Sequence, residues 1–349
     1  MSPFAGFEMP IQYSGIADEH QAVRTACGVF DVSHMGEVVV NGKDAERFVQ
    51  HIFTNDISGA KDGQVFYGMM CREDGGTVDD LLVYRMESWD FLLVINAANI
   101  DKDWAWIQEQ AKGFEVVLDN RSERYAQLAI QGPDAEAVVS EVLMMPVCKM
   151  IDFYNARDMG YEDRVRTILS RTGYTGEDGF EIYASPQCIN RYWDKLMASG
   201  RCKPCGLGCR DTLRFEVGLP LYGDELSDDI SPMMAGLGMF CKLDKDGGFI
   251  GRDALLKQKT EGTAKKLVGI ELKDKAIPRH GYTVLNAEGQ PIGEVTTGYH
   301  CLSVDKSVCM ALIDTAYAKL GTEVQVQIRK KVFPGVVCKK QFYNKSYKK

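Results

Sequence analysis

The sequence predicts an α+β protein that continues into an all-β C-terminal segment. Between residues 39 and 138, apolar runs of strand length alternate with amphipathic stretches of helical length. From Lys266 onward, strand-like runs follow one another between turns, and the helical period is absent. The chain has 349 residues, which is more than one hydrophobic core usually serves, so we expect two or three domains.

Each expected element has a consistent hydrophobic period and a turn signal at its ends. A proline near the first turn marks the start of the helix at 133–143. We expect helices at 18–27, 41–53 (after a short turn), 99–109, 133–143, 189–198, 211–217 and 252–259. We expect strands at 36–40, 64–70, 81–86, 90–95, 113–118, 125–130, 165–169 and 180–183, then at 266–272, 282–285, 292–297, 308–313, 323–328 and 332–339.

Composition excludes several classes of protein. The formal net charge of −8 argues against a general nucleic-acid binder, which needs a basic surface. No stretch approaches the length of a membrane span, and the first residues lack the apolar core of a signal peptide. The 11 cysteines are odd in number and follow no framework spacing, so we expect reduced thiols and a cytoplasmic protein without membrane contact.

The cysteines suggest one candidate metal site. Cys202 and Cys205 form a C-x-x-C pair with Cys209 nearby, which is half of a structural zinc motif. No second pair and no histidine cluster follows at zinc-finger spacing. We therefore expect no metal, and small buried residues packing a turn.

Two neighbouring carboxylates raise the first question of function. Asp79 and Asp80 end the stretch GGTVDD, directly before the apolar run LLVY. Successive side chains of a strand point to opposite faces, so one of the two is directed inward. A carboxylate at the edge of a core costs several kcal/mol unless a partner compensates it, so the inward residue is a candidate for ligand binding.

Other candidate site residues are individually weak. Asn96 follows a strand where asparagine often turns the chain, Tyr174 and Glu181 flank a glycine-rich loop, and Arg210 precedes an aspartate with which it can pair. Among the five histidines His34 looks most like a site residue, although a core or turn role is more common. The chain has no GxSxG elbow and no phosphate-binding P-loop, and RTGYTGEDG does not have the spacing of a dinucleotide-binding loop.

Taken together, the motifs are far more specific. The chain contains, in this order, FAGFEMP, FDVSHMGE, TND, GGTVDDLLVY, NAAN, QGP, SRTGYTGEDGFE, GLGCRDTLR and LPLYGDEL. This series closely resembles the folate-dependent aminomethyltransferase family, the T-proteins of the glycine cleavage system. The resemblance runs from Pro3 to Leu243 and continues more loosely through FIGRDAL, IPRHGY and QFY.

The resemblance implies a fold of three domains in a cloverleaf-like ring around a central folate-binding hole. Domain 1 would comprise residues 1–38 and 139–243, and domain 2 the inserted, ferredoxin-like α+β segment 39–138. Residues 244–261 would form a connector. Domain 3 would be the β-barrel or jelly-roll-like segment 262–349.

The resemblance also implies a function. The chain would transfer the one-carbon unit of an aminomethyl group, carried on the lipoyl arm of H-protein, to tetrahydrofolate, releasing ammonia. Asp80 would be the catalytic carboxylate, and no metal would take part. The residues matching folate-contacting positions of the family are Met35, Tyr67, Tyr84, Asn96, Tyr174, Glu181 and Arg210.

Departures from the family pattern keep two alternatives open. Met234 and Met239 replace an acid and a tryptophan that are common in the family, and Tyr299–Asp305 lacks a Ser-Pro pair. A folate-dependent demethylase or methyltransferase with a small-molecule donor would keep Asp80 and differ on this donor side. A non-catalytic folate-binding protein would lose the catalytic aspartate and most folate motifs, which this chain retains.

Overall fold

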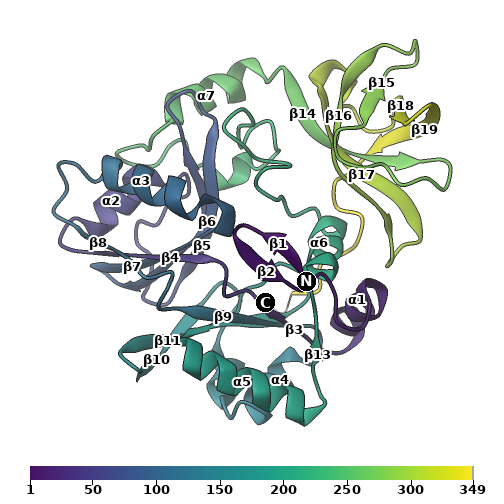
Figure 1. The fold of residues 1–349 in the computed structure, drawn as a ribbon. Helices are drawn as coiled ribbons and strands as arrows, with labels where there is room; N and C mark the ends of the chain where they lie inside the picture. Colours follow the sequence, from purple (N-terminus) through teal and green to yellow (C-terminus); the bar gives the residue numbers. More distant parts are fainter. Residues whose placement is uncertain (348–349) are drawn as a thin grey trace. The chain divides into compact units, whose positions relative to one another are not determined.

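The computed structural model describes residues 1–347. These residues form two compact units (Figure 1). Unit 1 comprises Met1–Gly68, Leu81–Leu213 and the end of the chain from Lys345, and unit 2 comprises Met69–Asp80 and Arg214–Asn344. No helix within the described residues combines the length and apolarity needed to cross a membrane.

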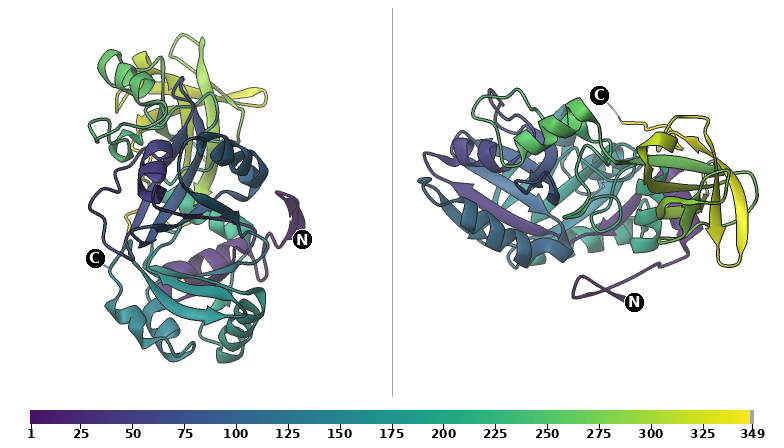
Figure 2. Two further views of the ribbon diagram at one scale, coloured as in Figure 1. Left: turned by 90° about the vertical axis from the view of Figure 1, so that its left-hand side faces the viewer. Right: turned by 90° about the horizontal axis from the view of Figure 1, so that it is seen from above.

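A six-stranded sheet in unit 1 has the order β10-β11-β12-β9-β3-β13. Its central strands are buried on both faces, because helices α4 and α5 pack on one side (Figure 1) and a second sheet packs on the other. The same helices, in teal, lie along this sheet in the left view of Figure 2. The strands are β3 (Gly28–Asp31), β9 (Ala126–Gln131), β10 (Ala156–Glu162), β11 (Val165–Ser170), β12 (Gly179–Ala184) and β13 (Lys203–Pro204), with helices α1 (Ile16–Thr25), α4 (Ala135–Glu141), α5 (Pro186–Ser199) and α6 (Leu207–Glu216).

Helix α5 illustrates how the sequence fixes a boundary. Ser185 accepts a hydrogen bond from the Cys188 N–H at 3.3 Å and caps the helix, and Pro186 occupies its first turn. Gly200 ends the helix in the left-handed region at φ 64°.

A five-stranded sheet has the order β5-β6-β7-β4-β8. Side chains from this sheet and from the six-stranded sheet share one hydrophobic cluster in unit 1, to which Tyr84 and Tyr183 both belong. The strands are β4 (Gly36–Asn41), β5 (Val65–Cys71), β6 (Thr77–Glu87), β7 (Asp90–Ile95) and β8 (Val117–Asn120), with helices α2 (Ala45–Ile52) and α3 (Ile100–Gln110).

Unit 2 contains a closed antiparallel barrel of order β14-β17-β16-β15-β18-β19, coloured green to yellow in Figure 2. The barrel closes because β14 pairs with both β17 and β19, and alternate side chains from its strands fill the interior. Helix α7 (Arg252–Glu261) precedes it. The strands are β14 (Lys265–Leu272), β15 (Thr283–Leu285), β16 (Pro291–Cys301), β17 (Lys306–Asp314), β18 (Glu323–Ile328) and β19 (Lys331–Cys338).

The predicted α+β class and all-β C-terminal segment are confirmed, with some differences in the elements. Strand β6 begins at Thr77 rather than at residue 81, so both aspartates of GGTVDD lie inside it. β8 begins at Val117 rather than at 113. The exposed edge strand β10 was not predicted, because it lacks the apolar alternation of a half-buried strand.

An N-terminal hairpin was also missed. β1 (Ser2–Phe4) and β2 (Phe7–Met9) are joined by Ala5 and Gly6, both with positive φ, as tight two-residue hairpins require.

The division into three domains stays a prediction. The barrel lies inside the segment 262–349. Strand β9 falls within the segment 39–138, yet it is hydrogen-bonded between β3 and β12 of the six-stranded sheet. This pairing favours an end of the inserted segment before Ala126.

The cysteines are distributed over both units. All 11 are free thiols; ten are buried and Cys338 is partly exposed.

Candidate active site

A buried carboxylate, Glu181, lies at the centre of the candidate site. It stands on β12 and is 5% exposed. Its Oε1 accepts a hydrogen bond from Gln127 Nε2 at 3.0 Å. Its Oε2 accepts from Thr172 Oγ1 at 2.5 Å and from the Tyr183 hydroxyl at 3.4 Å. All these donors are neutral, so the charge of the carboxylate is stabilised without an ion pair.

The donors belong to a larger group of buried hydroxyls. The Tyr84 hydroxyl lies 2.9 Å from that of Tyr183 and 3.2 Å from Ser170 Oγ. Ser170 Oγ lies 2.7 Å from Thr172 Oγ1, which donates to Glu181. Tyr84 is fully buried and its ring meets that of Tyr183 edge-on at 5.5 Å. Its hydroxyl thus adjoins Thr172 and Tyr183, both of which contact Glu181, and the folate contact expected of Tyr84 stays a prediction.

Burial and charge act on Glu181 in opposite directions. Desolvation raises the pKa of Glu181, and the Thr172 hydrogen bond, the Arg210 charge, Tyr183 and Gln127 each oppose this rise. Burial likewise lowers the pKa of Arg210, although a guanidinium stays charged at any physiological pH. The site thus combines a carboxylate that is costly to ionise with a nearby fixed positive charge.

Arg210 on α6 is oriented by an aromatic ring. Its guanidinium carbon lies 4.8 Å from the centre of the Tyr174 ring, a cation–π geometry. Arg210 also lines a small pocket whose other walls come from the N-terminal segment, β3 and the start of α6: Met9, Pro10, Tyr13, Phe30, Asp31, Cys205, Gly206 and Leu207. The arginine thus lies between this pocket and the Tyr174 ring.

His34 is a buried histidine near Arg210. It is 4% exposed, and its Nδ1 has no hydrogen-bond partner among the described residues. Burial, reinforced by the charge of Arg210, lowers the pKa of His34 to about 3, so the ring is neutral at physiological pH. Phe4 meets the ring edge-on at 5.5 Å. The ring is thus packed in the interior with Nδ1 unsatisfied among the described residues.

The glycine-rich loop that carries Tyr174 is built around Gln131. A Cβ on Gly173 would lie 2.0 Å from Gln131 Oε1, and one on Gly179 would lie 2.4 Å from Gln131 Nε2, so neither position admits a larger residue without displacement. Gln131 donates to the Thr172 carbonyl at 3.1 Å and accepts from the Thr175 hydroxyl at 2.9 Å. The glycines thus let a buried amide hold the loop.

Two arginines anchor the same loop. Arg171 binds both carboxylate oxygens of Asp178, at 2.9 and 2.6 Å. Arg24 on α1 donates to the Thr175 carbonyl at 2.7 Å and to Glu177 at 3.0 Å. Such bidentate and buried contacts fix geometry, so Tyr174 projects from a rigid loop.

Two other predicted residues are Met35, in the bend before β4, and Tyr67, on β5. Met35 packs against the cluster of Tyr84 and also against the cluster of Phe30. Tyr67 shares its face of β5 with buried Val65, and its carbonyl accepts from Asn55 Nδ2 at 2.9 Å. Each is partly exposed.

Asn96 directly follows β7. It is partly exposed and continues the strand face that carries Leu92 and Val94. Its carbonyl accepts from the Asn99 N–H at 2.9 Å and starts the turn into α3. Both the turn role and the site role considered for this residue are therefore compatible with its position.

The two aspartates of GGTVDD differ in exposure. Asp79 is fully buried, whereas Asp80 is partly exposed. Asp80 occupies the same face of β6 as Leu82 and Tyr84, because residues two apart on a strand share a face. The partly exposed aspartate is thus the one on the face that carries Tyr84.

The departures on the donor side lie in unit 2. Met234 and Tyr299 pack against one buried cluster beside Phe215, and Met239 is 72% exposed. The segment Tyr299–Asp305 forms the end of β16 and the turn into β17.

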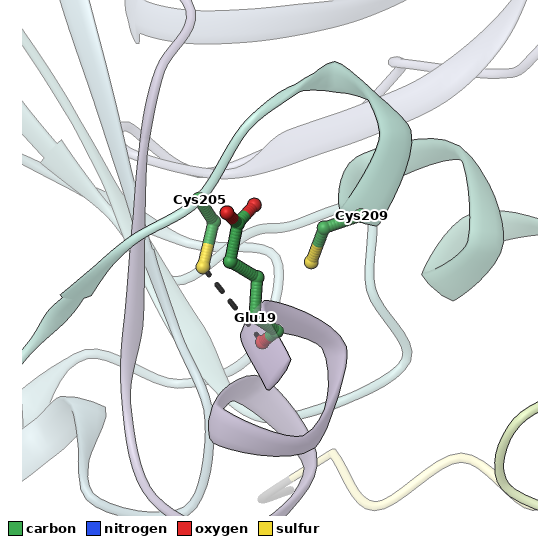
Figure 3. Close-up of side chains that lie close together, drawn as sticks. All are labelled: Glu19, Cys205 and Cys209. Carbon is green, nitrogen blue, oxygen red and sulfur yellow. Dashed lines mark hydrogen bonds between the residues drawn. The ribbon is translucent and has the colours of Figure 1, made fainter. Parts of the chain in front are cut away.

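Of the three cysteines considered for a metal site, Cys205 and Cys209 lie beside Glu19 (Figure 3), whereas Cys202 Sγ lies 3.3 Å from Cys27 Sγ. Glu19, Cys205 and Cys209 bring their ligand atoms within 4.8 Å of one another. Glu19 Oε1 accepts backbone N–H groups of Tyr13, Ser14 and Gly15 at 2.5, 2.8 and 3.2 Å, and Oε2 accepts that of Gly206 at 2.9 Å.

The thiols of this group are donors. Cys205 donates to the Glu19 carbonyl at 3.8 Å, the dashed line in Figure 3, and to that of Lys203 at 3.4 Å. The contact with Cys209, followed by burial, raises the pKa of the Cys205 thiol. The Glu19 carboxylate, which binds backbone N–H groups from both, holds the N-terminal segment to the residues just before α6.

Three functional residues escaped sequence reasoning. Gln127, Thr172 and Tyr183 all contact Glu181 directly. Tyr183 could have been found, since it lies two residues beyond Glu181 on the same strand face. Gln127 could not, because only the pairing of β9 with β12 brings it to Glu181.

Comparison with known proteins agrees with the motifs. Residues 1–245 match the model of the GCVT N-terminal domain, and residues 265–344 match that of the glycine cleavage T-protein C-terminal barrel domain. The aminomethyltransferase of Caldanaerobacter subterraneus subsp. tengcongensis is 50% identical over 99% of this chain and 92% of its own. That of Alkaliphilus oremlandii is 49% identical over 99% and 94%.

A solved structure matches equally completely. The glycine cleavage system aminomethyltransferase T from Bartonella henselae superposes with a TM-score of 0.94 at 32% identity, covering 100% of this chain and 95% of that one. The chain therefore belongs to the aminomethyltransferase family of enzymes, the glycine cleavage T-proteins.

Proposed function

We propose that this protein is the tetrahydrofolate-dependent aminomethyltransferase of glycine cleavage. The donor is an aminomethyl group on a lipoyl sulfur of H-protein, R–S–CH₂–NH₂. Its carbon–sulfur and carbon–nitrogen bonds break, and the CH₂ group bonds to N5 and N10 of tetrahydrofolate. The two N–H protons of the folate leave on the thiol and on ammonia, so the products are R–SH, NH₃ and 5,10-methylenetetrahydrofolate.

The observation that carries this proposal is the Glu181 carboxylate, buried and yet held only by neutral donors. A carboxylate kept in this way suits recognition of the N–H donors of a reduced pterin ring, since its hydrogen bonds come from neutral donors and leave acceptor capacity for a ligand. Arg210 suits a carbonyl or carboxylate of the same ligand. The full-length similarity to aminomethyltransferases supports this reading over that of a demethylase with a small-molecule donor.

Asp80 is assigned the catalytic role. Folate nitrogens must be positioned and lose a proton as they attack, and the carbon that they attack becomes cationic. A fixed carboxylate meets both needs, because it orients the nucleophile and stabilises the positive charge. Its partial exposure on β6 is consistent with access to a ligand.

The remaining residues would define the folate pocket. Met35, Tyr67, Asn96 and Tyr174 line it in this proposal, and each is partly exposed. Tyr84, which is fully buried, acts through Glu181.

We also propose a partner protein and a cellular location for the reaction. Lipoylated H-protein brings the donor, and the departures at Met234, Met239 and Tyr299–Asp305 are what keep a small-molecule donor as the alternative. We place the reaction in the cytoplasm, with no metal, no membrane contact and no nucleic acid involved. The three-domain division remains part of the proposal, with Asp80 at the central hole.

Replacement of Asp80 tests the proposal. Asp80→Asn keeps the side-chain shape, so the fold should persist while turnover falls at least about 100-fold, the usual scale for a lost general base. The measurement is tetrahydrofolate-dependent release of ammonia from aminomethylated H-protein, with the wild type beside the variant.

Asp79→Asn is the matched control. It alters the neighbouring carboxylate on the opposite face of the same strand. We expect it to retain most turnover, and thermal unfolding of both variants shows whether either has lost its fold. Normal turnover in Asp80→Asn would remove the assigned mechanism, and a wild type that binds tetrahydrofolate without releasing ammonia would contradict the donor.

A further inference from the structure

The buried hydroxyls beside Glu181 form a hydrogen-bonded chain that ends on its carboxylate. We infer that Tyr183, Tyr84, Ser170 and Thr172 are positioning residues that keep Glu181 ionised and oriented for its ligand. The inference rests on the proposed function, since it assigns tetrahydrofolate as that ligand. It gives Tyr84 a role through Glu181 in place of direct ligand contact.

The hydroxyls are linked in a continuous series. The shortest contacts join Tyr183 to Tyr84 at 2.9 Å, Tyr84 to Ser170 at 3.2 Å, and Ser170 to Thr172 at 2.7 Å, and in each of these pairs either hydroxyl can donate. At the carboxylate the direction is defined, because Thr172 donates to Glu181 Oε2 at 2.5 Å. The series thus ends on one carboxylate oxygen.

Contacts of 3.4 Å give further links among these hydroxyls and Glu181. Tyr84 lies 3.4 Å from Thr172 Oγ1, Tyr183 lies 3.4 Å from Glu181 Oε2, and Ser170 lies 3.4 Å from the Glu181 carbonyl. Linked hydroxyls polarise one another, so each donor strengthens the bond at the end of the chain.

The charged and titratable groups around Glu181 come from several elements. Arg210 from α6 is the nearby positive charge, and Tyr174 stacks on it. Glu37 on β4 acts on Tyr183 from the other side. Burial raises the pKa of Glu37 well above its ordinary range, which disfavours a second negative charge in this region.

Loss of a donor has a defined consequence for ligand binding. Burial already raises the pKa of Glu181, and the Thr172 bond is the largest opposing influence. Without it, more of the protein carries a protonated Glu181 at a given pH. A protonated carboxyl is a weaker acceptor for pterin N–H groups. As the pH is lowered, the variant should therefore lose binding at a higher pH than the wild type does.

The experiment measures tetrahydrofolate binding by anaerobic titration calorimetry across pH, together with KM and kcat for ammonia release. Thr172→Val should weaken binding about tenfold near pH 7, which corresponds to about 1.4 kcal/mol, the lower end for a hydrogen bond to a charged group. Tyr183→Phe should weaken binding less than Thr172→Val does. Tyr84→Phe should weaken it least, because Tyr84 contacts Thr172 and Tyr183 rather than the carboxylate. In all three, binding should recover as the pH rises, and kcat at saturating folate should stay close to that of the wild type.

Two further variants serve as rescue and control. Thr172→Ser keeps the hydroxyl and should restore the wild-type pH profile. Tyr125→Phe removes a hydroxyl from the same hydrophobic cluster, 4% exposed, whose hydrogen bond goes to Arg121 instead of Glu181. It should leave the profile unchanged.

The outcomes separate the two proposals. If Thr172→Val weakens binding equally at every pH, or not at all, while the wild type binds and turns over, the positioning role is wrong and the proposed function stands. If the folded wild type binds no tetrahydrofolate at any pH, the proposed function fails and this inference fails with it.

Discussion

Two buried glutamates, one in each unit, are held in contrasting ways. In unit 2, Glu225 accepts from Arg214 Nη1 at 2.8 Å, from the Leu221 N–H at 3.0 Å, and from the hydroxyls of Thr296 and Thr297 at 2.6 and 2.7 Å. In unit 1, Glu181 accepts from neutral side chains alone. The first carboxylate has a charged partner and a full set of donors, and the second retains acceptor capacity.

The difference separates a structural acid from a binding acid. Arg214 and Glu225 are 1% and 0% exposed, and together they tie the loop after α6 to strand β16 of the barrel. A cation at that distance would satisfy Glu181 as well, but it would also compete with any ligand. Neutral donors leave part of the stabilisation of Glu181 to the molecule that binds there.

A third buried glutamate marks the other extreme. Both carboxyl oxygens of Glu37 have no hydrogen-bond partner among the described residues, and the side chain is 1% exposed. Desolvation alone raises the pKa of this carboxyl. The series from Glu225 through Glu181 to Glu37 therefore runs from a carboxylate paired with arginine to a carboxyl without a hydrogen-bond partner among the described residues.

The largest expected effect comes from breaking the paired charge. Arg214→Met leaves Glu225 buried without its cation and should lower the free energy of unfolding by about 3–5 kcal/mol. Chemical denaturation followed by circular dichroism measures this. A loss under about 1 kcal/mol would mean that the two threonines and the Leu221 N–H suffice, and the contrast with Glu181 would disappear.

A gain in stability is expected at the unpartnered acid. Glu37→Met fills a similar volume with no polar group to desolvate, so the free energy of unfolding should rise by about 1–3 kcal/mol. The same denaturation experiment at pH 7 measures it. A destabilised variant would show that the Glu37 carboxyl has a solvent partner. Glu37 would then not stand at the unpartnered end of this series.

The smallest stability effect is expected at Glu181, and it should depend on pH. A carboxyl with a raised pKa adds stability below its unfolded-state pKa, and this is lost as the pH rises through the folded-state pKa. The wild type should therefore lose stability relative to Glu181→Gln over that interval, by about 1.4 kcal/mol for each unit of pKa shift. Unfolding measured from acid to neutral pH tests this, and parallel curves would mean that Glu181 does not titrate differently in the folded protein.

Much of the fold could be predicted from local patterns, because hydrophobic period and turn residues determine each element separately. Helix α5 with Ser185, Pro186 and Gly200 is such a case. Strand β10 is the opposite case, since its residues are exposed and only pairing with β11 makes it a strand. The early start of β6 has the same origin, because two aspartates do not indicate a strand on their own.

Residues of the candidate site could be predicted where they lie within a sequence motif. Glu181 and Tyr174 lie in one motif, and Asp80 in another. Gln127, Tyr84 and Tyr183 meet through contacts between strands distant in sequence. No local signal marks such a contact, and the folate contact expected of Tyr84 stays a prediction.

The thiols of this protein offer a practical probe. Ten of the 11 cysteines are buried, and only Cys338 is partly exposed. A thiol reagent applied to the native protein should therefore modify Cys338 first, leaving a single-labelled molecule. The buried thiols become reactive only as their surroundings open, and Cys27 and Cys148 lie in unit 1 whereas Cys241 and Cys309 lie in unit 2. Timed alkylation followed by peptide mass spectrometry would then follow the unfolding of each unit separately in one sample.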